Sequence, residues 1–269
     1  MADPCSHLHA TTSIWHARFK QQLEWTRSTR DFVYRRLNFS RCSSLLELGC
    51  GTGALLEEIA TRFVLPRLDE GKATRLVGID HNGEFLEEPR SILGQITRKI
   101  ELKEADAQQL PFPDGSFDVV YCHYFLMWNH PAQRGTILKE VRRVLRDGGW
   151  FVALAEPDYQ GWILEPPTPV REMLLASLTL SGGDLASGRR LAGDLAGFND
   201  VTIDCCSKVW TSVEWRAAFD SEWRFFQNLL AHEKETMAVL SRLKAEDKDS
   251  IERGSKFSFL PVIFGFGRK

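Results

Sequence analysis

Three glycines, Gly49, Gly51 and Gly53, stand between an apolar run at residues 44–48 and a segment with the pattern of a helix. Glycine lets a ligand approach the backbone closely, and the first turn of a helix points free N–H groups toward it. This stretch therefore predicts a ligand-binding loop. A tight turn between a strand and a helix that binds nothing is the alternative.

Two carboxylates follow the next apolar runs, Asp80 after one and Asp106 after another. A carboxylate at the end of a strand can accept hydrogen bonds from both hydroxyls of a ribose. The glycine pattern at residues 49–54 also fits the dinucleotide fingerprint, in which an acidic residue follows ~20 residues later. Asp80 lies further along than that, and a lengthened loop at residues 65–75 would account for the difference. Spacing alone therefore does not decide which nucleotide cofactor binds.

Alternating strands and helices have to position these residues. The apolar runs predict strands at residues 44–48, 75–80, 99–106, 117–124 and 150–156. Helical spacing predicts helices at residues 14–37, 53–63, within 83–98, and at 131–146. Short links between strands and helices are typical of a parallel sheet covered on both faces. The glycine loop and both carboxylates would then meet at the carboxyl edge of the sheet, where open α/β folds bind ligands.

The pattern changes after Glu156. Residues 156–170 contain four prolines and no periodicity, so they predict a loop or linker. The rest of the chain predicts helices near 169–180 and 188–198, a strand at 200–210, helix throughout 212–250 and a last strand at 256–269.

Composition narrows the class of protein. The 269 residues carry a formal net charge of −2, so no overall basic field attracts nucleic acid or an anionic membrane. No apolar run reaches the ~18 residues needed to span a bilayer, and the first residues lack the pattern of a leader. The six cysteines show no CxxC spacing, so neither a zinc site nor a disulfide framework is indicated. We therefore expect a soluble cytoplasmic protein without a metal, folded as one α/β domain with an insertion.

Four segments in order, "ELGCGTG", "VGIDHN", "EADAQQLPFPDGSFDVVYC" and "LKEVRRVLRDGGWFVALAE", closely resemble the class I S-adenosylmethionine-dependent methyltransferases. The resemblance covers roughly residues 40–160. It implies a doubly wound, seven-stranded α/β fold whose sheet is mostly parallel with the last strand antiparallel. The expected division is an N-terminal helical cap, a cofactor-binding Rossmann-like core, a helical insertion and the final strand of the core, at residues 1–40, 41–211, 212–250 and 251–269.

The same resemblance implies contacts to S-adenosylmethionine, position by position. The loop under the methionine portion of the cofactor matches Glu47, Gly49, Cys50, Gly51 and Gly53. Asp80 matches the carboxylate that binds the ribose, and His81 lies beside the adenine. Asp106 and Ala107 match the pair that hydrogen-bonds the edge of the adenine. Backbone carbonyls that hold the amino group of the cofactor match Cys122 and His123.

Methyl transfer is an in-line displacement, so the protein must mainly hold the nucleophile ~3–3.5 Å from the methyl group. A general base is needed only for a hydroxyl or a protonated amine. Candidates for that base follow the fourth and fifth strands, and they are His123, His130, Glu156 and Asp158. Aromatic residues in 121–131 and 156–163 could attract the sulfonium and line an apolar acceptor pocket.

The acceptor is expected to be a small molecule that reacts through oxygen, nitrogen or sulfur. After the predicted fourth strand the chain has neither the Pro-Pro-aromatic run nor the Pro-Cys dipeptide of nucleic-acid methyltransferases, and its acidic balance also argues against nucleic acid. The alternatives are a protein side-chain methyltransferase, a non-catalytic cofactor-binding partner subunit and a nicotinamide-dependent oxidoreductase. The insertion at 212–250 could form a lid over the acceptor or a homodimer surface. In the N-terminal segment, Trp25, Arg27 or Arg30 could face the methionine carboxylate, with solvated arginines beside a core tryptophan as the alternative.

Overall fold

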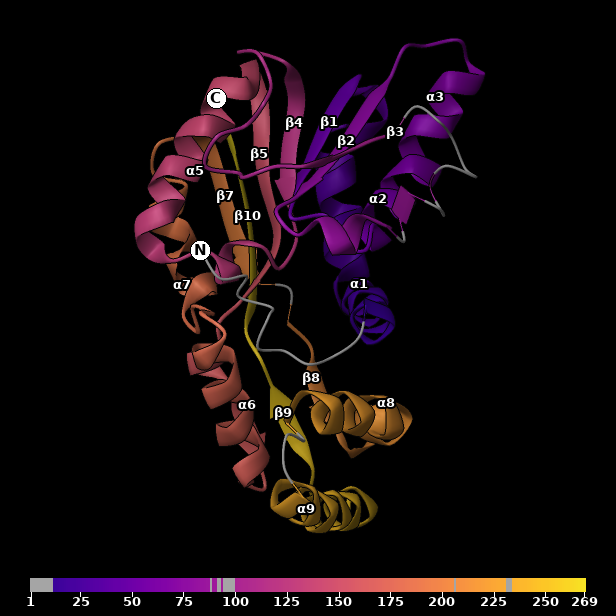
Figure 1. Cartoon of the computed structure of the whole chain (residues 1–269), viewed down its shortest axis with the longest axis vertical. Helices are drawn as coiled ribbons and strands as arrows, with labels where there is room; N and C mark the ends of the chain where they lie inside the picture. Colours follow the sequence, from indigo (N-terminus) through magenta and orange to yellow (C-terminus); the bar gives the residue numbers. More distant parts are fainter. Residues whose placement is uncertain (1–11, 88, 91–92, 94–99, 206, 231–233) are drawn as a thin grey trace.

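The chain folds around a seven-stranded sheet with the strand order β3-β2-β1-β4-β5-β10-β7 (Figure 1). The structure, a computed structural model, describes residues 12–87, 89–90, 93, 100–205, 207–230 and 234–269. The strands of this sheet are β1 (Ser44–Leu48), β2 (Arg75–Asp80), β3 (Ile100–Glu104), β4 (Phe117–Cys122), β5 (Leu145–Pro157), β7 (Asn199–Cys205) and β10 (Val262–Arg268). Strands β1 to β5 pair in parallel, and β10 pairs antiparallel with β5 and β7. The expected mostly parallel sheet with an antiparallel last strand is confirmed.

Both faces of the sheet are buried, which explains why its strands are continuous apolar runs rather than alternating ones. Leu45 of β1 packs on one side, and its neighbour Leu46 packs on the other. The first side is covered by α1 (Thr12–Arg36), α2 (Ala54–Ile59) and the adjoining turn η3 (Ala60–Val64). The second side is covered by α5 (Pro131–Val144) and α7 (Ser187–Asp194). Helix α2 begins at Ala54, directly after the glycine loop.

The segment expected as a lengthened loop at residues 65–75 begins instead as a helix, α3 (Leu65–Asp69). Pro66 lies in the first turn of this helix, where its missing N–H removes no helical hydrogen bond. After β2 the chain forms the short helix η4 (Gly83–Leu86). Half of the residues 83–98, within which a helix was expected, lie outside the described residues.

A second, three-stranded antiparallel sheet has the order β6-β9-β8 and was not predicted. Its strands are β6 (Ile163–Glu165), β8 (Val209–Thr211) and β9 (Phe257–Phe259). The expected single strand at 256–269 is wrong, because it divides into β9 and β10. Pro261 stands between them, and proline has no N–H to donate to a ladder. The strand expected at 200–210 divides in the same way into β7 and β8. The short helix η6 (Tyr159–Gly161) and β6 lie within the stretch expected as a loop.

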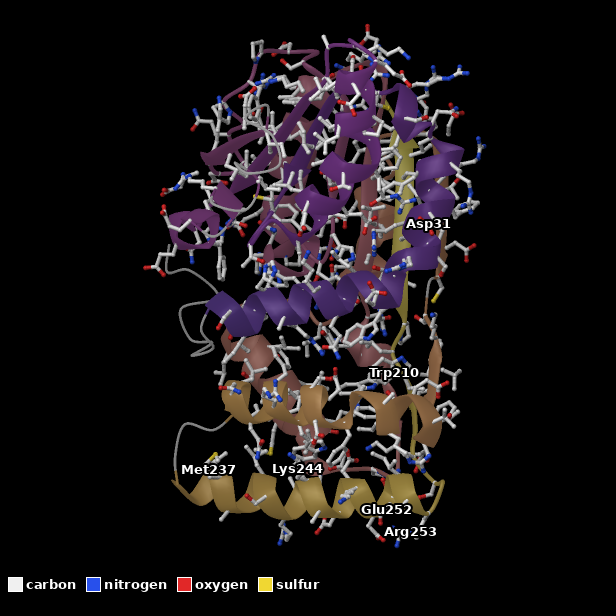
Figure 2. The ribbon with its side chains drawn as sticks, turned by 90° about the vertical axis from the view of Figure 1, so that its right-hand side faces the viewer. Asp31, Trp210, Met237, Lys244, Glu252 and Arg253 are labelled. Carbon is white, nitrogen blue, oxygen red and sulfur yellow. The ribbon has the colours of Figure 1, made fainter. Side chains whose placement is uncertain are left out.

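Three helices complete this end of the molecule, α6 (Pro169–Leu180), α8 (Ser212–Leu230) and α9 (Lys234–Glu252). Figure 2 shows α1, α8 and α9 as successive layers on one side of the large sheet. Apolar side chains from α1, α6, α8 and α9 form one buried cluster, which includes Trp15, Leu174, Trp223, Phe226 and Leu240. None of the helices in the described part of the chain is long and apolar enough to cross a membrane.

Candidate active site

The glycine loop connects β1 to α2 and has a backbone that only glycine adopts easily. Gly49 and Gly51 have φ angles of 64° and 50°, in the left-handed region. A Cβ atom on Gly49 would lie 2.4 Å from a ring carbon of Phe125, and one on Gly51 would lie 2.9 Å from a ring carbon of Phe19. Backbone and aromatic rings therefore approach closely here, and a side chain at either glycine would fill the space between them.

Asp80 ends β2 beside this loop. Its Oδ2 accepts a hydrogen bond of 2.8 Å from the N–H of Gly51, and its Oδ1 accepts one of 3.0 Å from the N–H of Asn82. The side chain is buried, so its charge is poorly screened by water. Asp80 thus fixes the loop and presents a carboxylate at the carboxyl edge of the sheet.

A cavity of about 440 Å³ lies at this edge, and we call it the strand-edge cavity. It brings together most of the predicted cofactor residues, namely Glu47, Gly49, Cys50, Gly51, Asp80, His81, Asp106, Ala107 and His123. Gly53 and Cys122 do not line it. Cys122 is fully buried under α5, where burial raises the pKa of its thiol.

Glu47 brings a buried carboxyl group to the cavity. Its Oε2 and the hydroxyl of Tyr121 are both buried, and the described residues give them no contact of good hydrogen-bond geometry beyond their interaction with each other. Burial raises the pKa of Glu47 well above its usual range. A buried carboxyl group with so few partners is costly, so a polar ligand atom in the strand-edge cavity would stabilise it.

Asp106 and His81 are exposed at the other predicted positions. Asp106 Oδ1 accepts a hydrogen bond of 2.8 Å from the N–H of Gln108, which is the geometry of a side-chain turn. His81 Nδ1 lies 3.5 Å from Asp80 Oδ1. Both side chains stay close enough to the cavity to contact a ligand in it.

His123 follows β4 and joins the site to α1. Its Nε2 lies 3.0 Å from Thr26 Oγ1, which also contacts the carbonyl of Gln22 and receives a hydrogen bond from Arg30. All three contacts can be hydrogen bonds at once only if Thr26 donates to Gln22 and His123 donates from Nε2. Nδ1 of His123 is then an unprotonated acceptor. Burial and the charge of Arg30 hold the pKa of His123 well below 6.5, so the ring is neutral.

Glu156 does not lie at the wall of the strand-edge cavity, although the sequence made it a candidate base. Its two carboxylate oxygens accept hydrogen bonds from the N–H groups of Phe125, Leu126 and Met127, at 2.8–3.1 Å. The hydroxyl of Ser187 donates a further bond of 2.8 Å. Glu156 is completely buried and holds the turn after β4 in place.

The other two candidate bases are also engaged by the protein. Asp158 Oδ2 pairs with Arg189 at 2.7 Å, and Asp158 is buried away from the strand-edge cavity. His130 lines that cavity, but its Nδ1 accepts a hydrogen bond of 3.2 Å from the N–H of Ala132 at the start of α5. Of the four candidates, only His123 and His130 line the strand-edge cavity, and their described contacts leave Nδ1 of His123 and Nε2 of His130 for a ligand.

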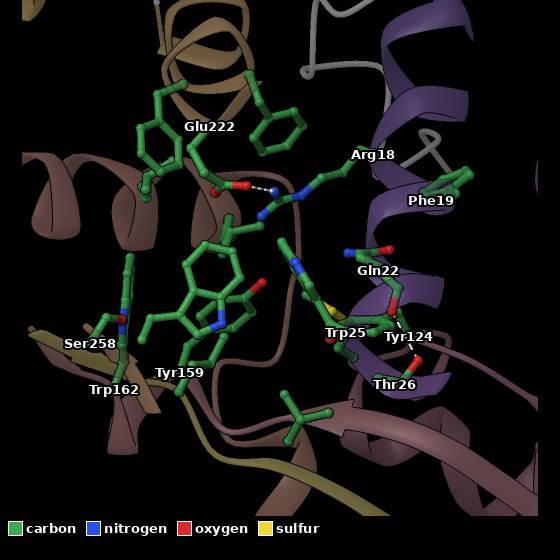
Figure 3. A pocket seen from close by; sticks show the side chains of 18 of the residues that line it. Arg18, Phe19, Gln22, Trp25, Thr26, Tyr124, Tyr159, Trp162, Glu222 and Ser258 are labelled. Atoms are coloured by element: carbon green, nitrogen blue, oxygen red, sulfur yellow. Dashed lines mark hydrogen bonds and ion pairs between the residues drawn. The ribbon is translucent and has the colours of Figure 1, made fainter. Parts of the chain in front are cut away.

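A second cavity of about 150 Å³ adjoins the first, and we call it the aromatic cavity (Figure 3). Its aromatic lining consists of Trp15, Phe19, Trp25, Tyr124, Trp128, Tyr159, Trp162, Trp210, Trp215, Phe225 and Phe226. Four residues, Phe19, Gln22, Tyr124 and Trp128, line both cavities. They form a shared wall between the place predicted for the cofactor and a largely apolar chamber.

Two residues of this wall, Tyr124 and Trp128, belong to the aromatic residues of 121–131 that the sequence offered as pocket lining. The sequence missed the other two, Phe19 and Gln22, which lie on α1. Trp25 lines the aromatic cavity rather than the strand-edge cavity. Arg27 is exposed and pairs with Glu24, and Arg30 is buried with Glu58, so neither is available to a cofactor carboxylate. In the described ranges of the chain, no group of three His, Cys, Asp or Glu residues could hold a metal ion.

The strand order, the left-handed glycine loop and the carboxylate at the end of β2 are those of the class I methyltransferase fold. Residues 45–149 match the family model described as a methyltransferase domain. The chain is 36% identical over 128 residues to an uncharacterised methyltransferase of Schizosaccharomyces pombe, covering 46% of this chain and 44% of the relative. It is 34% identical over 137 residues to a demethylmenaquinone methyltransferase of Lactococcus lactis, covering 51% and 49%. The chain thus spans about half the length of these curated relatives.

Solved structures agree on the fold. The cyclase SpnF superposes with a TM-score of 0.54 at 18% identity, covering 91% of this chain and 80% of that one. This likeness shows the fold alone, and it covers more of the chain than residues 45–149.

Proposed function

We propose that this protein transfers the methyl group of S-adenosylmethionine to a small acceptor bound in the aromatic cavity. The observation that carries the proposal is the shared wall of Phe19, Gln22, Tyr124 and Trp128. A molecule in each cavity would meet the other only across this wall. S-adenosylmethionine supplies a methyl group that its sulfonium has already activated for transfer.

The residues of the strand-edge cavity fit this cofactor. The backbone of the glycine loop would lie under the methionine portion, and Asp80 would accept hydrogen bonds from the ribose. Asp106 and Ala107 would contact the adenine, with His81 beside it. The buried carboxyl group of Glu47, whose described side-chain interaction is with Tyr121, favours a ligand with polar donors, such as the amino group of the cofactor.

The acceptor is proposed to be small and partly apolar. Rings dominate the aromatic cavity, and the charges that line it are few. Among the relatives are a demethylmenaquinone methyltransferase and a sterol 4-C-methyltransferase of Caenorhabditis elegans, names that support an apolar acceptor. The rings of Tyr124 and Trp128 at the shared wall would orient the nucleophile toward the methyl group and exclude water from it.

For a hydroxyl acceptor, we propose that Nδ1 of His123 accepts the proton of the hydroxyl group. The nucleophile would lose its proton to this nitrogen as its new bond to the methyl carbon forms and the carbon–sulfur bond breaks. The products are the methylated acceptor and S-adenosylhomocysteine. The hydrogen bond to Thr26 supports this role because it fixes the tautomer in which Nδ1 accepts.

The first test measures the binding of S-adenosylhomocysteine by calorimetry. We expect wild-type protein to bind in the micromolar range and Gly51→Arg not to bind, because the new side chain would occupy the space of the ligand. Gly71→Arg is the matched control, since Gly71 has a φ of 73° but nothing within 4 Å of an added Cβ.

Equal affinity in both variants would place the cofactor elsewhere. Binding without methyl transfer to any member of a small-molecule panel would favour the non-catalytic alternative. Binding of a nicotinamide cofactor in place of S-adenosylhomocysteine would favour the oxidoreductase.

A further inference from the structure

Arg18 of α1 lies between two aromatic rings inside the aromatic cavity. Its guanidinium carbon lies 4.5 Å from the ring centre of Trp25 and 4.4 Å from that of Phe225. The side chain is only 12% exposed. Two rings this close confine the guanidinium, whose N–H groups donate hydrogen bonds along the edges of its own plane.

One of those edges is already used by the protein. Arg18 Nη1 donates to Glu222 Oε1 at 2.6 Å and to Gln21 Oε1 at 2.8 Å. Gln21 Nε2 donates to the same oxygen of Glu222 at 2.6 Å. Figure 3 shows Arg18 reaching from α1 across the cavity to Glu222, which is buried on α8. These contacts anchor the guanidinium at Nη1.

The other edge, formed by Nε and Nη2, has no hydrogen-bond partner among the described residues of the chain. Two parallel N–H donors on one guanidinium edge match the two oxygens of a carboxylate. An arginine confined between two rings and anchored at one nitrogen has already lost much of the side-chain freedom that binding would cost.

The charges around the cavity favour an anion over a cation. Arg18 and Lys208 line it against the single carboxylate of Glu222. One oxygen of Glu222 already accepts hydrogen bonds from Arg18 and Gln21. The aromatic rings alone would attract a cation, but a cationic ligand would have to enter against this excess of positive side chains.

We propose that the methyl acceptor carries a carboxylate, and that the Nε–Nη2 edge of Arg18 binds it. This inference rests on the proposed function. Arg18 precedes Gln22 of the shared wall by one helical turn, a spacing of ~5–6 Å between Cβ atoms. The carboxylate would therefore anchor one end of the acceptor near the wall, with its apolar body among the rings.

The test uses the full chain saturated with S-adenosylhomocysteine and three probes of matched shape: phenylpropionate, phenylpropionamide and phenylpropylamine. Calorimetry should show phenylpropionate binding at least about tenfold more tightly than the amide, because charge-assisted paired hydrogen bonds are the stronger kind. The amine should bind more weakly than either.

Variants test whether Arg18 causes the preference for phenylpropionate. Arg18→Gln combined with Glu222→Gln removes both charges together, so no buried carboxylate is left unpaired, and it should abolish the preference for phenylpropionate. Arg18→Lys should also lose most of it, because an ammonium cannot form the paired contact. Arg27→Gln, an exposed position on the same helix, is the matched control and should keep the preference.

The comparison of the three probes on the wild-type protein tests the inference even if a variant fails to fold. Equal affinity for the carboxylate and the amide, or tighter binding of the amine, would overturn the inference. If S-adenosylhomocysteine itself fails to bind, the proposed function falls. If it binds and the carboxylate preference is absent, only the role of Arg18 is wrong.

Discussion

At the scale of single residues, the buried neutral ring of His123 makes stability depend on pH. The unfolded chain binds a proton at His123 near the ordinary pKa of 6.5, whereas the folded chain binds it only at lower pH. Between these two pKa values the unfolded state holds more protons, so the free energy of unfolding rises with pH. His123 therefore leaves stability intact above about pH 6.5 and lowers it as the pH falls below that value.

The corresponding variant is His123→Gln, whose amide cannot be protonated in this range. We expect the loss of stability between about pH 7.5 and about pH 5.5 to be smaller in this variant than in the wild type. Urea unfolding at the two pH values measures the difference. An identical pH dependence in both proteins would mean that His123 titrates normally in the folded state.

Asp80 offers a second test at this scale, because its charge can be removed with little change of shape. Asp80→Asn should weaken the binding of S-adenosylhomocysteine by about 1.5–3 kcal/mol for each hydrogen bond lost from a charged acceptor. Asp114→Asn, an exposed carboxylate paired with Arg143, is the control and should bind normally. If Asp80→Asn also binds like the wild type in calorimetry, Asp80 does not contact the ribose.

The sequence placed Asp80 and the glycine loop together, because both are the ends of buried strands and parallel strands share one carboxyl edge. It could not assign Glu156, which also ends a strand. The direction of that side chain depends on the turn at residues 125–127 folding back toward Ser187, a contact between segments far apart in the chain. Local patterns locate strand ends, but they do not give the direction of a side chain that long-range contacts decide.

At the scale of elements, Glu156 holds the short helix η5 (Leu126–Trp128) on the end of β5. Glu156→Ala would leave three backbone N–H groups and the hydroxyl of Ser187 without their acceptor in a buried place. We expect a loss of about 4 kcal/mol or more in the free energy of unfolding, since each of the four unsatisfied buried groups costs about 1–3 kcal/mol. Thermal unfolding measures the change.

Glu156→Gln separates this structural role from a catalytic one. The amide keeps an acceptor oxygen for the turn, so most of the stability should return, and methyl transfer should return with it. A folded Glu156→Gln protein that binds the cofactor but has lost about 10²-fold or more of its turnover would support Glu156 as a base instead.

The elements that the sequence failed to predict share one cause. Strands β6, β8 and β9 have three residues each, and every one pairs with a segment distant in the chain. Such short strands have too few positions to show a period, and their pairing is set by the packing of α6, α8 and α9 around them. Alternating strands and helices in the first part of the chain carry long, regular patterns, which is why that part was predicted closely.

At the scale of the whole molecule, some helices line the strand-edge cavity and others do not. Helix α1 lines both cavities, α8 lines only the aromatic cavity, and α9 lines neither. Figure 2 shows the same order, with α1 nearest the large sheet and α9 furthest from it. Ligands of the two cavities should therefore stabilise different helices against local opening.

Hydrogen exchange of the backbone amides can measure which helices each ligand stabilises. At about 100 times its Kd, a ligand adds about 2.7 kcal/mol to the stability of any opening that destroys its site. S-adenosylhomocysteine should therefore slow exchange in α1 and the glycine loop, while amides of α9 that exchange by local opening keep their rates. Phenylpropionate added to this complex should then slow exchange in α8. If S-adenosylhomocysteine alone slows α9 as much as α1, the helices open as one unit with the sheet, and the separation of acceptor-side from cofactor-side elements is wrong.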